Sequence, residues 1–194
     1  MTKEQSTISI RRMEQEDYPR VSEILQAGMD TGEATYERDA PADWDSFISH
    51  RVRELAFVAE EQGVILGWIT ATPTSHRGVF DGVVEDSIYV SPDAAGKGVA
   101  GKLLDVLLDK AGEQGFWSMH SSIFLENEGS VALHESRGFT PVGVFHCMAK
   151  MSYGPKEGQW RDNLLMERIL EKGPAWESFS QTEAYKNSNS YKED

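Results

Sequence analysis

The chain has 194 residues, of which 39% are hydrophobic and 26% charged, a composition typical of one globular domain. Its 32 acidic and 19 basic side chains give a formal charge of −13, which argues against nucleic acid as a partner. No apolar run could cross a bilayer, Met1–Ser6 lacks the apolar stretch of a secretory leader, and the lone Cys147 has no disulfide partner, so we expect a cytoplasmic protein.

Hydrophobic periodicity and turn residues predict an alternation of strands and helices along the chain. Strands are expected over 7–13, 55–60, 64–72, 83–90, 117–125, 140–153 and 159–170. Helices are expected from Glu16, after an N-cap at Asp43, after the glycine loop that ends near Ala100, and over 129–137. These elements predict one α+β domain over residues 1–171, followed by a polar and flexible tail over 172–194.

A glycine-rich segment stands between the predicted strand 83–90 and the helix that follows it. Its sequence is Gly96-Lys97-Gly98-Val99-Ala100-Gly101-Lys102. Free backbone N–H groups and the helix dipole favour an anion such as phosphate at this kind of junction. An ordinary glycine-containing turn is the alternative that needs no ligand.

Three phosphate ligands are compatible with this loop to different degrees. A nucleoside triphosphate is disfavoured because Leu103 stands where a P-loop needs a hydroxyl for Mg²⁺. A dinucleotide is the weaker alternative, because five residues (91–95) separate the strand from Gly96 and the elements are too few for a doubly wound sheet. The third ligand is an acyl-CoA, with its pyrophosphate on the loop and its pantetheine amides along the preceding strand.

Several motifs resemble the GNAT acetyltransferase superfamily. They are Ile88-Tyr89-Val90-Ser91-Pro92, the step Gly98-Val99-Ala100, the segment 127–130, and the segment from Leu133-His134-Glu135 to Gly138-Phe139. Within the superfamily the chain is most similar to the phosphinothricin and methionine sulfone or sulfoximine N-acetyltransferases. That resemblance implies a mixed sheet of about seven strands, with helices on both faces and a splay between the fourth and fifth strands.

The resemblance also implies acetyl-CoA as co-substrate. The cofactor-binding residues that it implies are Ile88, Tyr89, Val90, Gly96, Lys97, Gly98, Val99, Ala100, Gly101, Asn127 and Ser130. The chain departs from the superfamily at Ala95, where Arg or Gln usually heads the loop. We expect no metal, because the zincin-like start His134-Glu135 is followed by Gly138 where the second histidine belongs.

Acetyl transfer to an ammonium ion needs a base, and the departing thiolate needs a proton. Glu85 alternates with Ser87 and Tyr89 on one strand face, and it is either a solvated carboxylate or, as the resemblance implies, the general base. His134 is either a structural hydrogen-bonding residue or an auxiliary acid or base. Cys147 is more typical of a small buried apolar residue than of a nucleophile, so we expect direct attack in a ternary complex.

The resemblance implies a small amino-acid-like amine as acceptor. The residues expected near it are Tyr36, Glu37, Ser75, His76, Arg77, Glu85, Asp86 and Ser87. It also implies a homodimer, to which the aromatic residues Trp44, Phe80, Tyr153 and Trp160 could contribute contacts. Two alternatives remain: an N-acetyltransferase for proteins or peptides, and a non-catalytic module that binds acyl-CoA.

Overall fold

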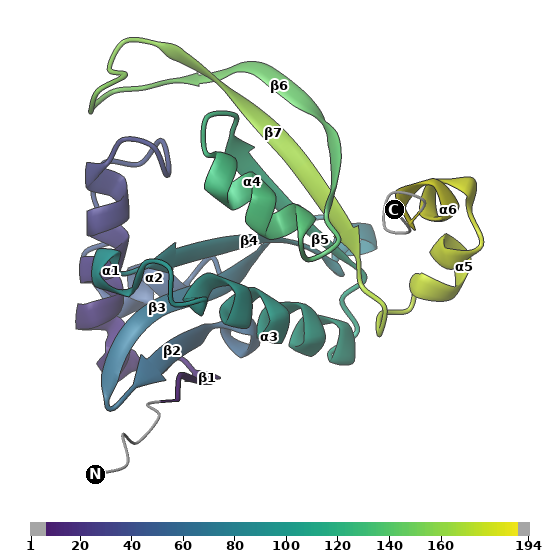
Figure 1. The fold of residues 1–194 in the computed structure, drawn as a ribbon, viewed down its shortest axis with the longest axis horizontal. Coiled ribbons are helices and arrows are strands. Elements are labelled where there is room, and N and C mark those ends of the chain that lie inside the picture. Colours follow the sequence, from purple (N-terminus) through teal and green to yellow (C-terminus); the bar gives the residue numbers. More distant parts are fainter. Residues whose placement is uncertain (1–6, 190–194) are drawn as a thin grey trace.

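In a computed structural model, which describes residues 7–189, the chain folds around one seven-stranded sheet (Figure 1). The strands are β1 (Ser9–Arg12), β2 (Phe57–Glu61), β3 (Val64–Pro73), β4 (Val83–Val90), β5 (Ser118–Phe124), β6 (Thr140–Lys150) and β7 (Trp160–Ile169). Their order is β1-β2-β3-β4-β5-β7-β6, and all neighbouring pairs are antiparallel except β4 with β5. This sheet confirms the α+β class and is not the parallel sheet of a dinucleotide-binding fold.

Helices cover both faces of the sheet. They are α1 (Tyr18–Asp30), α2 (Trp44–Ile48), α3 (Val99–Glu113), α4 (Glu128–Glu135), α5 (Trp176–Ser180) and α6 (Glu183–Asn189). Short 3-10 helices cover Gln15–Asp17, Arg53–Leu55, Gly78–Phe80 and Pro92–Ala94. As predicted, Asp43 caps α2, because its Oδ1 accepts a hydrogen bond from the Ser46 N–H at 2.8 Å. None of the described helices combines the length and apolar character that a membrane span requires.

Two hydrophobic clusters hold the helices to the sheet. On one face, α3 packs its leucines against alternate residues of β2, β3 and β4, with Leu103, Leu104 and Leu107 fully buried. On the other face, α1 and α2 surround the fully buried Trp68 of β3, whose Nε1–H donates to the Val21 carbonyl at 3.2 Å. The apolar residues of α1 and α3 recur at helical spacing, and each helix therefore buries one apolar face, on opposite sides of the same sheet.

The sheet opens between its fourth and fifth strands. β4 and β5 pair in parallel only at Val83 with Ser118, Val84 with Met119, and Glu85 with His120. β4 continues to Val90, and β5 to Phe124, without further pairing between them. The splay implied by the family resemblance is thus present, and it begins beside Glu85.

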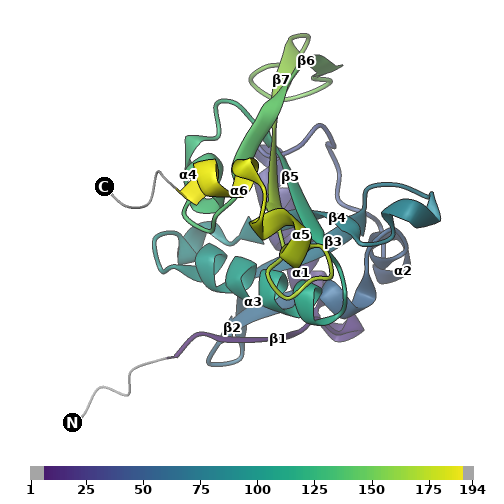
Figure 2. The same cartoon turned by 90° about the vertical axis from the view of Figure 1, so that its right-hand side faces the viewer.

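The hairpin of β6 and β7 projects beyond the other described elements (Figure 2). Most of β6 is exposed, and its register with β7 breaks between Phe145 and Ala149. Cys147 lies in this irregular stretch with a φ of 50°, and it is exposed. The expectation of a buried Cys147 is therefore wrong, because β6 is an edge strand that no other described element covers.

Beyond β7 the chain forms the short helices α5 and α6 (Figure 1). The rings of Trp176, Phe179 and Tyr185 contact one another at centroid distances of 5.2 to 5.9 Å. The flexibility expected for 172–194 stays a prediction. Residues 1–6, at which no leader was expected, and residues 190–194 of the tail lie outside the described part.

Candidate active site

A cavity of about 430 Å³ occupies the splay between β4 and β5. The second half of each strand forms its walls, and the start of α4 and the loop before α2 close its ends. Predicted residues on its lining are Tyr36, Glu85, Asp86, Ser87, Ile88, Tyr89, Val90, Asn127, Ser130 and His134. Residues far apart in the sequence thus meet at one opening in the sheet.

Glu85 and Asp86 both line this cavity, although consecutive residues of β4 place their side chains on opposite faces of the strand. Glu85 is half-buried and lies on the same strand face as Tyr89, whose ring stacks on Trp68 at 4.9 Å. Burial, followed by the nearby charge of Asp86, raises the pKa of Glu85. A carboxylate in this position can accept a proton at a higher pH than a solvated glutamate.

The side chain of Asp86 is buried beside His134. Its Oδ2 lies 3.2 Å from His134 Nε2, and both side chains are 1% exposed. The same nitrogen lies 3.1 Å from Ser121 Oγ, and Nδ1 lies 2.7 Å from the Ser130 carbonyl oxygen. Burial alone would lower the pKa of His134, but the hydrogen bond and charge of Asp86 and the Ser130 carbonyl outweigh it, so that the pKa is raised.

Tyr36 reaches the cavity from the loop between α1 and α2. Its hydroxyl donates to Asn163 Oδ1 at 2.5 Å, and its ring meets Phe124 edge-on at 4.9 Å. Arg161 of β7 anchors the same loop, because its buried guanidinium donates to the Gly32 carbonyl and the Glu33 carboxylate. The loop is therefore bound to the end of the β5–β7 pair and is not freely exposed.

The predicted coenzyme loop has the geometry of an anion site. Gly96 and Gly98 have φ values of 76° and 74°, and an added Cβ on either would meet no described atom within 4 Å. Gly98 is the N-cap of α3, so the first-turn N–H groups of the following residues point away from the helix without helical acceptors. These features fit a pyrophosphate, and Leu103 is buried in the core instead of offering a metal ligand.

Four predicted acceptor residues do not line the cavity within this chain. Glu37 is exposed, and its carbonyl accepts from the Tyr153 hydroxyl at 2.6 Å. Ser75, His76 and Arg77 lie in the loop between β3 and β4, where Arg77 stacks over Phe80 at 5.3 Å. That loop leaves the sheet at the paired start of β4, at the end opposite to the splayed residues.

Other lining residues were not predicted from the sequence. Ser121, Ser122 and Phe124 of β5 line the cavity, together with Met148 and Asn163 from the hairpin. The polar pair Ser121-Ser122 in a largely buried strand is the one local signal that could have indicated them. Arg161 carries no such signal, because only the fold brings it to the loop at Gly32.

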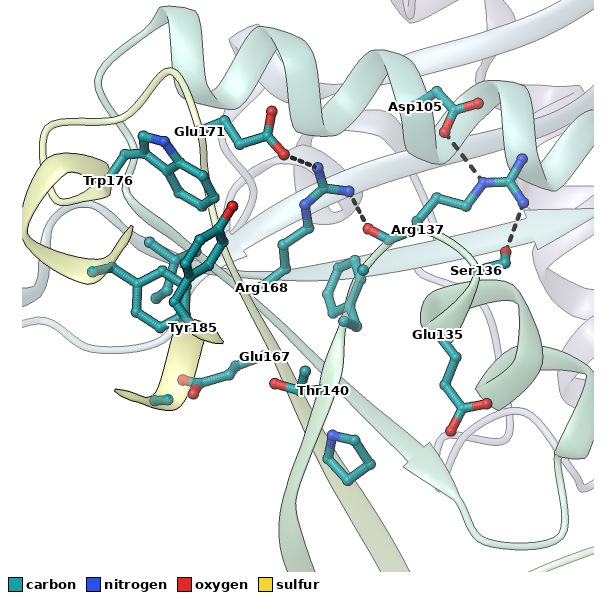
Figure 3. A pocket seen from close by; sticks show the side chains of 16 residues that line it. Asp105, Glu135, Ser136, Arg137, Thr140, Glu167, Arg168, Glu171, Trp176 and Tyr185 are labelled. Carbon is teal, nitrogen blue, oxygen red and sulfur yellow. Dashed lines mark hydrogen bonds and ion pairs between the residues drawn. The ribbon is translucent and has the colours of Figure 1, made fainter. Parts of the chain in front are cut away.

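A second, larger cavity of about 1190 Å³ lies between α3, the start of β6, the end of β7 and the tail helices. Figure 3 shows Arg137 and Arg168 on its wall, with Trp176 and Tyr185 at the tail side. Arg137 pairs with Asp105 at 3.2 Å, and Arg168 pairs with Glu171 at 3.2 Å. The cationic groups of this cavity are thus already engaged by neighbouring carboxylates.

Most of the chain is similar in sequence to known proteins. The family model described as "Acetyltransferase (GNAT) family" matches residues 9–139. Phosphinothricin N-acetyltransferase of Alcaligenes faecalis is 32% identical over 173 residues, which cover 85% of this chain and 84% of that protein. L-methionine sulfoximine/L-methionine sulfone acetyltransferase of Salmonella typhimurium is 31% identical over 173 residues, which cover 87% of this chain and 98% of that protein.

Solved structures agree with these relatives. The crystal structure of a phosphinothricin acetyltransferase from Sinorhizobium meliloti in complex with AcCoA matches with a TM-score of 0.75 and 30% identity. The match covers 87% of this chain and 91% of the other. The likeness therefore extends over most of the chain, and not only over the glycine loop.

Proposed function

The chain belongs to the GNAT acetyltransferase family, and we propose that it acetylates the amino group of a small amino-acid-like molecule by direct transfer in a ternary complex. The chain is an acetyl-CoA-dependent N-acetyltransferase of the phosphinothricin and amino-acid acetyltransferase group. The observation that carries the finer proposal is the cavity at the splay, which has two adjacent carboxylates, Glu85 and Asp86, on its lining. Such a cavity favours a cationic ammonium group.

Acetyl-CoA supplies the activated acetyl group as a thioester. The residues proposed to hold it are the N–H groups of the loop 96–101 for the pyrophosphate, and the open edge of β4 at Ile88 and Val90 for the pantetheine amides. Asn127 caps α4, and its Oδ1 accepts from the Ser130 N–H at 3.1 Å. The amide NH₂ of Asn127 therefore remains available to the coenzyme.

Glu85 is proposed as the general base. Its raised pKa makes it a stronger base than a solvated glutamate, and its ionised carboxylate attracts the acceptor ammonium. Glu85 then takes a proton from the acceptor nitrogen, directly or through one water. The acceptor lone pair becomes free to attack while the nitrogen is still held in the cavity.

His134 is proposed as the proton donor to the leaving thiolate. It lies on the cavity wall in the last turn of α4, beside Asp86 of β4. Tyr36 and Ser87 are proposed to contact the acceptor, because both line the cavity. The lining contains no Arg or Lys. We propose that Arg77, with Ser75 and His76, meets an acidic group of the acceptor at the Glu85 end of the cavity, because their loop enters β4 at Val83, two residues before Glu85.

A homodimer is also proposed, paired through the projecting hairpin. The exposed apolar residues of this hairpin are Val142, Val144, Phe145, Met148 and Trp160. Met148 also lines the cavity, so a second copy on this edge would close the acceptor site from outside. Of the aromatics considered for this contact, Phe80 and Trp160 are exposed, whereas Trp44 and Tyr153 are buried in the core and cannot contribute. Sedimentation of Phe145→Glu should give a monomer where the native chain gives a dimer.

The proposed function is tested by measuring thiol release from acetyl-CoA with a panel of amines. The panel holds free amino acids, methionine sulfone, methionine sulfoximine, phosphinothricin and a peptide with a free N-terminus. We expect turnover with a small amino acid analogue and a drop of about 10²- to 10⁴-fold in Glu85→Gln. Glu157→Gln, an exposed glutamate on the 154–158 turn, is the matched control and should keep full activity. Turnover with the peptide alone would favour a protein acetyltransferase, and coenzyme binding without turnover on any amine would favour a sensing module.

A further inference from the structure

Asp86 makes a contact that the proposed reaction does not itself require. It comes from β4, His134 comes from α4, and the two side chains meet at the cavity wall with only 1% exposure each. The Asp86 Oδ2 is 3.2 Å from His134 Nε2. Within residues 7–189, the other oxygen, Oδ1, is buried and has no hydrogen-bond donor. A buried carboxylate with one unpartnered oxygen is costly unless a positive charge lies beside it.

The contacts of the His134 ring indicate where its protons lie. The Ser130 carbonyl can only accept, so His134 Nδ1, at 2.7 Å from it, carries a hydrogen. A neutral ring with that tautomer would turn the Nε2 lone pair toward the Asp86 carboxylate, which also offers only lone pairs. A proton between them belongs on the imidazole, because imidazole is the stronger base of the two. The contacts therefore favour an imidazolium with both N–H groups engaged.

The other surroundings of the ring add no competing charge. Ser121 of β5 offers a hydroxyl at 3.1 Å from Nε2, and the Phe139 ring meets the imidazole edge-on at 4.9 Å. On β4, Glu85 lies next to Asp86 and adds negative charge. On α4, Glu135 follows His134 but is exposed. Among the described residues, Asp86 is thus the charged group that acts on the ring, and its charge favours the imidazolium.

Resting on the proposed function, we infer that Asp86 is a positioning residue that holds His134 as an imidazolium, so that His134 acts as the acid of the reaction and Glu85 alone acts as its base. His134 Nε2 gives its proton to the sulfur, which keeps the electron pair of the broken carbon–sulfur bond. Glu85 takes the proton that the acceptor nitrogen loses as its bond to the acetyl carbon forms. Because the acceptor enters as an ammonium ion, its nitrogen loses two protons in all, and Glu85 passes the first to solvent before it takes the second. His134 regains its proton from solvent, so each turnover converts ammonium and thioester into amide and thiol and releases one proton.

The inference gives a specific pH signature. In the native protein, a plot of activity against pH should have two limbs. On the acidic limb activity rises with pH as Glu85 deprotonates, and on the alkaline limb it falls as His134 deprotonates. Asp86→Asn removes the charge that raises both pKa values, so both limbs should move to lower pH, the alkaline limb by about one unit or more. A merely structural role for Asp86 would lower activity at all pH values without moving either limb. Glu135→Gln is the matched control, because it removes an adjacent carboxylate that does not touch the ring, and neither limb should move.

The charge on His134 can be measured without any acetyl donor. In protein labelled with ¹⁵N-histidine, the ring signals missing from His134→Gln identify this residue, and its two nitrogens report their protonation. We expect both to be protonated at pH 7 in the native protein, with a midpoint above 6.5, and a midpoint below 6.5 in Asp86→Asn. A neutral His134 at pH 7, or an unchanged midpoint in Asp86→Asn, would overturn the inference. If Asp86→Asn does not fold, the native spectrum and that of Ser121→Ala, which keeps Asp86 and should keep the imidazolium, still decide it. Failure to acetylate any amine would instead count against the proposed function.

Discussion

Replacing Arg161 with methionine should loosen the loop that carries Tyr36 while leaving the sheet intact. The Arg161 guanidinium donates to the Gly32 carbonyl at 3.1 Å, to Glu33 at 2.7 Å and to Glu126 at 3.1 Å. It also lies 3.8 Å from the centroid of the Phe124 ring. One buried cation thus joins the loop after α1 to the ends of β5 and β7.

The magnitude follows from the burial of each partner. Arg161 is 1% exposed, but Glu33 and Glu126 are 42% and 51% exposed, so water screens much of their attraction. A charged hydrogen bond contributes about 1.5 to 3 kcal/mol, and the contact with the Phe124 ring adds about 1 kcal/mol. Methionine keeps the apolar volume and removes the cost of burying a charge, which offsets part of the loss. We expect Arg161→Met to lower the free energy of unfolding by about 3 kcal/mol.

The matched control is Lys156→Met, which removes another cation from the same two acids. Lys156 Nζ lies 2.6 Å from Glu126 and 3.5 Å from Glu33, but its side chain is 23% exposed. Its loss should cost about 1 kcal/mol or less. Urea unfolding followed by tryptophan fluorescence gives both values, and the acceptor KM should rise in Arg161→Met alone, because that variant alone releases Tyr36. Equal stability losses, or an unchanged acceptor KM in Arg161→Met, would refute the reasoning.

Three further predictions concern the Glu85 carboxylate and three glycines. The pKa of Glu85 is raised and its ionised form is the active one, so the midpoint of the fall in kcat/KM with decreasing pH should lie above 4.5. This fall should be absent in Glu85→Gln. A fall that persists in that variant would identify another base. Gly98→Ala and Gly63→Ala place a side chain at nearly the same positive φ, 74° and 78°, in open space, so each should cost about 1 to 2 kcal/mol in urea unfolding, while the KM for acetyl-CoA should rise only for Gly98→Ala. A rise of that KM in both variants would mean that backbone strain, and not the loop, decides it. Gly82→Ala would bring a Cβ to 1.9 Å from the Trp117 ring, and we expect a loss of about 3 kcal/mol in thermal unfolding; a loss below about 1 kcal/mol would mean that the ring moves aside freely.

The order of the elements was largely predictable because it depends on local patterns. β4 begins and ends at the residues that the alternation predicts, Val83 and Val90, and Asp43 caps α2 as its side chain suggested. The glycines at 96 and 98 adopt the positive φ that only glycine adopts without strain. In each case the signal lies within a few residues of the structure that it specifies.

Contacts between distant segments were not predictable in the same way. Alternation placed Asp86 on the face opposite Glu85, but nothing near it indicated that His134, 48 residues away, would lie within hydrogen-bond distance. The buried position of Arg161 depends on Gly32 and Glu33, 128 residues or more away. The exposure of Cys147 follows from the lack of any described layer over β6, which is a property of the sheet and not of the residue.

By itself, the sequence determined which residues form strands, helices and the glycine loop, because backbone preferences and apolar periodicity act over a few neighbours. It also determined the acidic character of the chain and, through its motifs, the family. Only the tertiary structure decided that β4 and β5 separate after Glu85 and that a buried carboxylate meets an imidazole in the gap. Those outcomes depend on how helices and strands pack across the whole sheet, and packing joins residues that no local pattern connects.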